Sequence, residues 1–516
     1  MVTLRTILLH CIFFFFLFSA HANKNEKVKV APFFQSHMVL QQNQAINIWG
    51  TAGANERIEV ELDGNIKVIT ANEEGDWSVV FPKRKASFNP VELRVNNQLF
   101  TDILIGELWL CAGQSNMAFP LFKSDYPDWE NNCSNTNLRL LRMENIRAVA
   151  KEGYTKEELA RCNPNDFFRG NWSQSNPGSA RNFSAVAWIM GNKLSRELNV
   201  PVGLIQVAVG GSAMNNWLPP HILKKHPLTE GLYKTDWLEN EEVFVNHRKR
   251  AKAAFQHVLK EGEPFIPGEM AYRWMCEPGF LFEAGIAPLK GLNFKGIVWY
   301  QGESDAYSDK VAYDAKELFG QLIHSWSNHF EKKELPFVFV QLPAYKSAPW
   351  PIMREVQRMA DKNIPNTSMV VTIDLGLKEN IHPSDKTPIG NRLANMALKD
   401  VYKQDDLAGF PSLKKIKVKN SKLILHFDNC ENGWQHLVNE ITGFEIKNKD
   451  GKYYPAIAEI TGETTIVLTS GATSPEGVRY GWAAFPEPAL KLFNKAGLPL
   501  GPFVVYLNGN SDLQNQ

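Results

Sequence analysis

The 516-residue chain has almost no net charge, since 56 basic residues stand against 55 acidic ones. Binding to nucleic acid or to an anionic membrane surface depends on an excess of positive charge. The sequence therefore predicts no nucleic-acid partner, and a neutral or weakly charged ligand fits it better.

Long hydrophobic runs are absent after the first 22 residues, so no later segment is expected to span a membrane. Residues 1–22 combine Arg5, an apolar stretch and Ala20-His21-Ala22, the pattern of a cleaved export signal. An uncleaved anchor is the alternative, but the apolar stretch is shorter than the roughly 20 residues that a spanning helix needs. We expect a secreted or periplasmic protein without membrane attachment after cleavage. The sequence leaves its oligomeric state open.

Cysteine is also scarce. One of the six lies in the predicted signal, and the rest are widely scattered: Cys111, Cys133, Cys162, Cys276 and Cys430. Their spacing matches no metal motif, and we expect neither a metal nor another cofactor. The odd number leaves at least one thiol unpaired, and the sequence does not decide whether a pair such as Cys133 and Cys162 is bridged.

The length predicts more than one core, and the residue pattern changes twice along the chain. Short alternating runs between glycine turns predict a β-sandwich over 23–105. Buried-type strands that alternate with helical stretches predict a parallel sheet covered by helices over 106–405. Short strands return over 406–516 and predict a second β domain. The fold class is therefore α/β with flanking β domains.

The strongest local signal is an apolar strand, residues 106–111, that runs into a tight turn of small residues ending at Ser115. Substrates of open α/β folds bind at the carboxyl ends of the strands, so this hydroxyl is a candidate nucleophile. Met117 replaces the second glycine of G-x-S-x-G, so the turn is not that of an ordinary α/β-hydrolase. A serine that only caps the turn is the alternative.

Three later segments carry polar groups at predicted strand ends. Gly210-Gly211 follows a strand at 202–207 and could bring backbone N–H groups close to a ligand oxygen. Gln301 and Glu303 follow the strand at 296–299, and His382 follows the last predicted core strand, 368–373. Each has a structural alternative, as a plain loop, a buried polar pair or an inert histidine. Their succession in one sheet is more specific than any one of them.

A serine, glycine donors, an amide and a late histidine in this order resemble the SGNH or GDSL-type hydrolases. More narrowly, the chain resembles the sialate O-acetylesterase family, which includes acetylxylan-esterase-like members. The matching runs are Met38 to Gln42, Gly113 to Met117, Trp299 to Ser304, Gln341 to Pro343, Ile381 to Pro383 with Lys386, Gly390 to Ala394, Arg479 to Trp482 and Gly497 to Phe503. The resemblance spans nearly the whole mature chain. It implies a three-layer α/β/α parallel sheet flanked by β-sandwich-like domains.

The resemblance also implies the chemistry, which is removal of O-acetyl groups from carbohydrate by a serine esterase without a cofactor. Ser115 would be the nucleophile and His382 the general base. The backbone N–H groups of Ser115 and Gly211 would form the oxyanion hole. The side-chain amide of Gln301 is a candidate third donor, at a place where typical members carry asparagine.

The acid of the triad stays open between two residues. Glu303 is favoured, because the acetylxylan-esterase-like branch uses the carboxylate of its Gln-Gly-Glu motif. Glu379 stands three residues before His382, where many SGNH enzymes have aspartate. If neither carboxylate contacts the imidazole, the site would work as a dyad with a backbone carbonyl orienting the ring. Asp374 is expected to be a structural residue at the strand end.

The acetylated sugar that would be the substrate also stays open. A sialate pocket should offer a cation to the sugar carboxylate, and Arg354 is a candidate, with a helix-surface salt bridge as its alternative. Plant-wall glycans such as acetylated xylan would lie on Trp217 or Trp274, and Asn116 is a further candidate contact. A different class of function, a non-catalytic glycan-binding protein, would need no convergence of serine, histidine and carboxylate.

Overall fold

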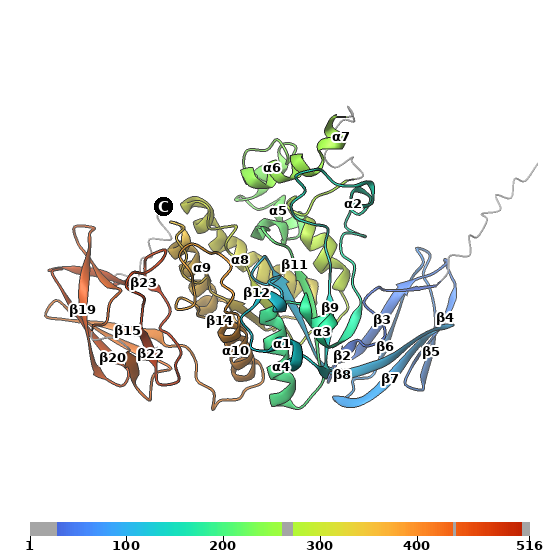
Figure 1. Cartoon of the computed structure of the whole chain (residues 1–516), viewed down its shortest axis with the longest axis horizontal. Coiled ribbons are helices and arrows are strands. Elements are labelled where there is room, and N and C mark those ends of the chain that lie inside the picture. Colours follow the sequence, from blue (N-terminus) through green and yellow to red (C-terminus); the bar gives the residue numbers. More distant parts are fainter. Residues whose placement is uncertain (1–27, 261–271, 437–439, 508–516) are drawn as a thin grey trace, which may run out of the picture.

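The computed structural model describes residues 28–260, 272–436 and 440–507 (Figure 1). The predicted export signal, residues 1–22, lies outside the described residues. A β-rich part stands at each end of the chain, and a part that mixes strands with helices lies between them (Figure 1). The mixed α/β class predicted from the sequence is confirmed.

The first part consists of two sets of antiparallel strands. One set is the sheet β1-β3-β6, and the other joins β5, β4, β7 and β8 in that order. Buried and exposed residues alternate along these strands, and inward residues such as Ile48, Val60 and Leu93 share one core. The strands are β1 (Lys29–Val30), β2 (Val39–Gln41), β3 (Ile46–Thr51), β4 (Arg57–Leu62), β5 (Asn65–Thr70), β6 (Asp76–Phe81), β7 (Ser87–Val95) and β8 (Gln98–Gly113).

Strand β8 belongs to two parts of the molecule. Its first half pairs antiparallel with β7, and its second half pairs parallel with β11 and β12 in the central sheet. Its 16 residues make it about 50 Å long. The boundary at 105/106 expected from the sequence therefore falls inside one continuous strand.

The central sheet is parallel from β9 to β14, in the order β9-β11-β8-β12-β13-β14, and β10 pairs antiparallel with β9 at its edge. Every residue of β11, β12 and β13 is buried, as expected for strands covered on both faces. The strands are β9 (Asn135–Arg142), β10 (Trp172–Ser175), β11 (Val202–Ala208), β12 (Gly296–Tyr300), β13 (Phe337–Val340) and β14 (Thr367–Val370).

Four long helices accompany this sheet. Helix α4 packs against α10, and α8 packs against α9. Ser184 and Ser308 cap α4 and α8, since each hydroxyl accepts a hydrogen bond from a backbone N–H of the first turn. The helices are α4 (Ala185–Leu198), α8 (Asp309–His329), α9 (Trp350–Asn363) and α10 (Thr387–Met396). The other helices are α1 (Trp129–Asn132), α2 (Lys156–Ala160), α3 (Pro177–Arg181), α5 (Pro220–Leu223), α6 (Val245–Ala254) and α7 (Gln256–Lys260).

The last part contains an antiparallel sheet with the order β15-β16-β20-β19-β18-β21-β23 and a small pair, β17-β22. The strands are β15 (Ser412–Lys419), β16 (Lys422–Asp428), β17 (Trp434–His436), β18 (Phe444–Asn448), β19 (Tyr453–Gly462), β20 (Thr465–Ser470), β21 (Pro475–Tyr480), β22 (Leu492–Asn494) and β23 (Phe503–Tyr506). Strand β23 contacts α9, so this part packs against the central one.

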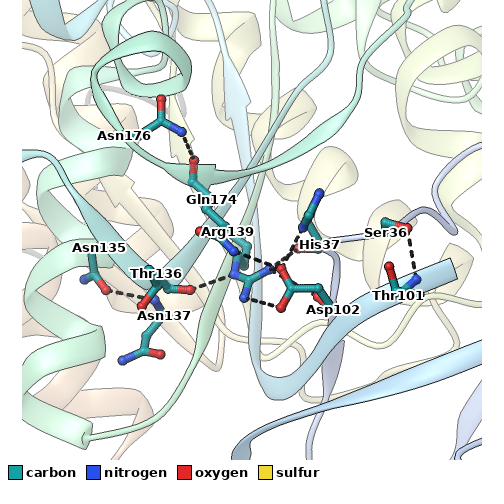
Figure 2. A network of polar contacts seen from close by, with 10 residues as sticks. All are labelled: Ser36, His37, Thr101, Asp102, Asn135, Thr136, Asn137, Arg139, Gln174 and Asn176. Atoms are coloured by element: carbon teal, nitrogen blue, oxygen red, sulfur yellow. Dashed lines mark hydrogen bonds and ion pairs between the residues drawn. The ribbon is translucent and has the colours of Figure 1, made fainter.

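A polar network ties the first part to the edge of the central sheet (Figure 2). The guanidinium of Arg139 in β9 donates to both carboxylate oxygens of Asp102 in β8, at 2.7 and 3.0 Å. His37 Nδ1 lies 2.6 Å from the same carboxylate, and Gln174 of β10 donates to it at 2.9 Å. The Arg139 side chain is only 3% exposed. These bonds hold the pKa of Asp102 well below its ordinary value.

The described residues bear on two expected absences and on the open question of disulfides. Over 28–260, 272–436 and 440–507, no helix is long and apolar enough to cross a bilayer. In the same ranges no group of three or more His, Cys, Asp or Glu side chains is arranged to hold a metal ion. The five cysteines that follow the predicted signal are all buried and unpaired.

Candidate active site

Ser115 and His382 meet at the carboxyl edge of the central sheet. Ser115 lies on the turn that follows β8, and His382 lies on the loop between β14 and α10. His382 Nε2 is 2.8 Å from Ser115 Oγ, although 267 residues separate them. This distance is short enough for direct transfer of the hydroxyl proton.

The serine turn depends on a glycine that precedes it. Gly113 has φ of +142°, and a Cβ placed on it would lie 2.2 Å from the carbonyl oxygen of Tyr300 on β12. Only glycine permits that approach without strain. The neighbouring strand can therefore lie against the turn and bring Gln301 and Glu303 to the same edge.

A second glycine turn, Gly210-Gly211, lies beside the nucleophile. A Cβ placed on Gly210 would be 3.6 Å from the Ser115 Cβ. Within the described ranges, the backbone N–H groups of Ser115 and Gly211 donate to no protein acceptor. Two N–H groups left unengaged beside a nucleophile are suited to an oxyanion.

The Gly211 turn is fixed by three side chains. Gln301 Nε2 donates to the Ser212 carbonyl at 3.2 Å, and Trp217 Nε1 donates to Ser212 Oγ at 2.9 Å. His247 Nε2 lies 2.7 Å from the Gly211 carbonyl. Burial lowers the pKa of His247 to about 4, so the ring is neutral near pH 7 and donates its Nε2 hydrogen to that carbonyl.

Glu303 is buried, and its hydrogen-bond partner is Asn116 rather than His382. Asn116 Nδ2 donates to Glu303 Oε1 at 2.5 Å and to the carbonyl of Ile381 at 3.0 Å. Asn116 Oδ1 accepts a hydrogen bond from Lys386 Nζ at 2.6 Å. Asn116 therefore links the buried carboxylate, the buried ammonium and the residue that precedes His382.

Burial shifts the pKa values of all three titratable groups in this cluster. It raises the pKa of Glu303 to about 7 and lowers that of Lys386 to about 8. Burial, followed by the charge of Lys386, also lowers the pKa of His382. The imidazole is thus held in its neutral form near pH 7, the form that can accept a proton.

The triad expected from the sequence does not form in this structure. In the described part of the chain no carboxylate bonds to His382, whose hydrogen-bond partners there are Ser115 Oγ and, through its backbone N–H, the side chain of Asn380. Glu379 pairs with Lys346 at the surface, and its side chain is 69% exposed. The prediction of Glu379 as the triad acid is therefore wrong. Glu303 is connected to the His382 loop through the side chain of Asn116. Asp374 forms a bidentate ion pair with Arg392, as fits a structural role.

Two polar side chains expected to contact substrate already form hydrogen bonds within the protein. Gln301 donates its two amide hydrogens to Ser212 and Asp305, so neither is left for an oxyanion. The prediction of Gln301 as a third oxyanion donor is therefore wrong. The side chain of Asn116 is fully buried and engaged at both ends, so it is not placed to bind a sugar. Both side chains instead hold the loops that carry the site.

The residues expected to bind the sugar are inside the core. Trp217 packs edge-on against Trp299 and has no exposed surface, and Trp274 is stacked on Trp237 with 1% exposed. Arg354 is fully buried in α9 and donates to the carbonyl of Ala483. It is neither a sugar-facing cation nor part of a helix-surface salt bridge. Sequence patterns do not reveal which side chains of these types pack inward, and this is why the three assignments were wrong.

Three residues that support the site were not identified from the sequence. Asp305 accepts hydrogen bonds from Gln301 and from the backbone of Met214, while His247 and Arg250 of α6 lie against the Gly211 turn. The spacing of His247 and Arg250, three residues apart on one helix, was the available signal. Nothing in the sequence connected that helix to the glycine turn.

Comparison with known proteins confirms the resemblance indicated by the motifs. A family model described as carbohydrate esterase, sialic acid-specific acetylesterase, matches residues 265–399, which include Glu303 and His382. The chain is 27% identical to the sialate O-acetylesterase of Rattus norvegicus, over 92% of this chain and 94% of that protein. It is 25% identical to the sialate O-acetylesterase of Homo sapiens, over 93% and 92% respectively. Among solved structures, a carbohydrate acetylesterase from Xanthomonas citri matches with a TM-score of 0.75 and 26% identity, covering 93% of this chain and 99% of that one.

Proposed function

We propose that this chain is a serine esterase that removes O-acetyl groups from carbohydrate, with an SGNH-type site and sialate O-acetylesterase activity. The observation that carries the proposal is the 2.8 Å separation of Ser115 Oγ and His382 Nε2, beside two unengaged backbone N–H groups. The sequence matches to sialate O-acetylesterases support the carbohydrate substrate.

The geometry gives each group a step in ester cleavage. His382 accepts the Ser115 proton as the oxygen attacks the acetyl carbonyl, and the N–H groups of Ser115 and Gly211 bind the oxyanion. Collapse breaks the ester bond, and His382 returns the proton to the departing sugar hydroxyl. Water, activated by His382, then hydrolyses the acetyl-serine and releases acetate.

In this proposal His382 and Ser115 act as a dyad, and Glu303 is a positioning residue. Its carboxylate holds Asn116, which donates to the Ile381 carbonyl and so fixes the loop that carries the imidazole. The loop is also held from its other side, where Ser384 donates to Asp125 at 2.7 Å. A rigid loop keeps the imidazole within reach of the hydroxyl.

We also propose a more detailed fold for the three parts and a cellular location for the protein. The pairs α4–α10 and α8–α9 are taken as the two helical layers of an α/β/α sandwich, and the flanking antiparallel strands as β-sandwich-like domains. A secreted or periplasmic location rests on the sequence pattern of residues 1–22.

The test of the activity is Ser115→Ala, measured by release of acetate from 4-nitrophenyl acetate and from an O-acetylated sugar. We expect a loss of kcat of about 1,000-fold or more, because the nucleophile is removed. Ser87→Ala is the control, since Ser87 lies in β7 of the first part and, among the described residues, its hydroxyl bonds only to the backbone of Asn89 in the same strand. Full activity in Ser115→Ala would overturn the proposal.

A serine-directed organophosphate separates catalysis from simple glycan binding. The esterase should carry a covalent adduct on Ser115, detected by mass spectrometry of its peptides, and His382→Ala should react far more slowly. Comparing acetate release from O-acetylated sialic acid and from acetylated xylan then distinguishes sialate esterase activity from acetylxylan esterase activity. A protein that bound glycan without forming the adduct would be a binding protein.

A further inference from the structure

Helix α6 lies directly against the turn that carries the oxyanion donor Gly211. The helix lies near the carboxyl end of β11 (Figure 1). Its His247 side chain bonds to the Gly211 carbonyl at 2.7 Å. One turn further along α6, Arg250 Nη1 is 2.6 Å from the point where a Cβ on Gly211 would be. Gly210, which precedes Gly211 in the chain, lies beside Ser115, so the guanidinium of Arg250 stands at the turn that borders the nucleophile.

This guanidinium has no protein partner in the part of the chain that the structure describes. No hydrogen bond or ion pair of the Arg250 side chain is formed with those residues, and the residue is exposed. Its neighbours on the helix differ: Arg248 donates to the Val243 carbonyl and Lys252 pairs with Glu239. Five N–H donors and a permanent positive charge are thus left available beside the site.

A partly exposed aromatic pair lies at the start of the same helix. Phe244, the residue that precedes α6, stacks on Tyr307 with ring centroids 4.2 Å apart, and Tyr307 is 41% exposed. Tyr307 closely follows Glu303 in the segment after β12. An aromatic surface suits the apolar face of a sugar ring, and a guanidinium suits a carboxylate. Helix α6, which lies against the Gly211 turn, therefore carries the two features that an acidic sugar requires.

We propose that Arg250 binds the carboxylate of an acetylated acidic sugar and selects such sugars over neutral ones. The proposal rests on the proposed esterase function, because it places this carboxylate while the acetyl group reaches Ser115. The shared chemistry is a sugar carboxylate, whether of a sialic acid or of a uronic acid. It gives this role to Arg250 in place of the buried Arg354.

The test is Arg250→Gln, with Arg248→Gln as a control that removes the same charge from the same helix. Four substrates are compared: 9-O-acetyl-N-acetylneuraminic acid, an O-acetylated glucuronic acid, O-acetylated xylobiose and 4-nitrophenyl acetate. For an acidic sugar, Arg250→Gln should raise KM about 10- to 100-fold, the worth of a charge-assisted hydrogen bond, with kcat little changed. Both neutral esters should keep their KM, and Arg250→Lys should recover part of the loss.

The outcomes separate this proposal from the one on which it rests. The acidic sugar whose KM changes identifies the source of the carboxylate. An unchanged KM on both acidic sugars, an equal change on the neutral esters, or the same effect from Arg248→Gln would overturn the role of Arg250. Hydrolysis that survives Ser115→Ala would instead overturn the esterase proposal itself.

Discussion

Two carboxylates at opposite ends of the same sheet differ in their hydrogen bonding and in the direction of their pKa shifts. Asp102, at the junction of the first two parts, receives hydrogen bonds from Arg139 and Gln174 and contacts His37, and its pKa is held well below the ordinary value (Figure 2). Glu303, near the nucleophile, receives a hydrogen bond from Asn116, while its Oε2 is buried and has no partner among the described residues. Burial raises its pKa to about 7.

The comparison distinguishes a carboxylate that stabilises the folded state from one whose burial costs free energy of folding. A carboxylate paired with a buried guanidinium stays ionised and contributes to stability. A carboxylate that is desolvated and incompletely paired opposes folding over the pH range in which it should be ionised. Such groups gather at functional sites, where position is worth more than stability.

Among the variants that test this comparison, Asn116→Ala has the largest expected effect on activity. This change removes the bridge between Glu303, Lys386 and the Ile381 carbonyl, so the His382 loop loses its anchor. We expect kcat for 4-nitrophenyl acetate to fall about 100-fold, the cost of misplacing a catalytic group by about 1 Å. Asn176→Ala, which changes an amide in the junction network, should leave kcat within about twofold (Figure 2). Equal losses in the two variants would remove the distinction between the two networks.

The next effect is on stability, from Asp102→Ala. Arg139 would remain buried without its counterion, and the free energy of unfolding should fall by about 3 kcal/mol, with kcat little changed. Because the folded-state pKa of Asp102 lies below its ordinary 3.8, this contribution is present above pH 3.8 and is lost as the pH falls below it. Urea unfolding of both proteins between pH 3 and 7 measures the difference. The exposed pair Asp63–Arg84 supplies the control, since Asp63→Ala should cost less than about 1 kcal/mol.

The smallest effect is a change in pH dependence, from Lys386→Met. The charge of Lys386 lowers the pKa of His382, so its removal should raise that pKa and move the acid limb of kcat/KM to higher pH. Lys346→Met is the matched control, since Lys346 lies at the surface and pairs with Glu379. An acid limb that stays in place in Lys386→Met would show that this ammonium does not act on the imidazole.

The sequence predicted the parts of the site that lie at strand ends. The strands predicted at 202–207 and 296–299 are found as β11 and β12, because continuous apolar runs of this length are typical of strands covered on both faces of a parallel sheet. The carboxyl ends of such strands share one edge, and so Ser115 and His382 were predicted to meet. Their roles as nucleophile and base remain proposals.

What could not be predicted depends on which way side chains point. Trp217 and Arg354 have the right chemistry for sugar binding, but the first is packed among tryptophans and the second is enclosed beside Ala483. Glu303 was favoured over Glu379 as the partner of His382, yet the side-chain amide of Asn116 lies between Glu303 and the His382 loop. A sequence gives the residue types at an edge but not the partners that occupy them.

Strand β8 has a consequence for dissecting the molecule. Because the strand that pairs with β7 continues unbroken to the turn before Ser115, the first part is not a removable appendage. A truncation at residue 106 would cut through a shared strand and would also remove Asp102, leaving Arg139 uncompensated. Any shortened version meant to be an autonomous enzyme should therefore begin before β1. Replacing the first part with another domain would require redesign of the first half of β8, the strand that leads to Ser115.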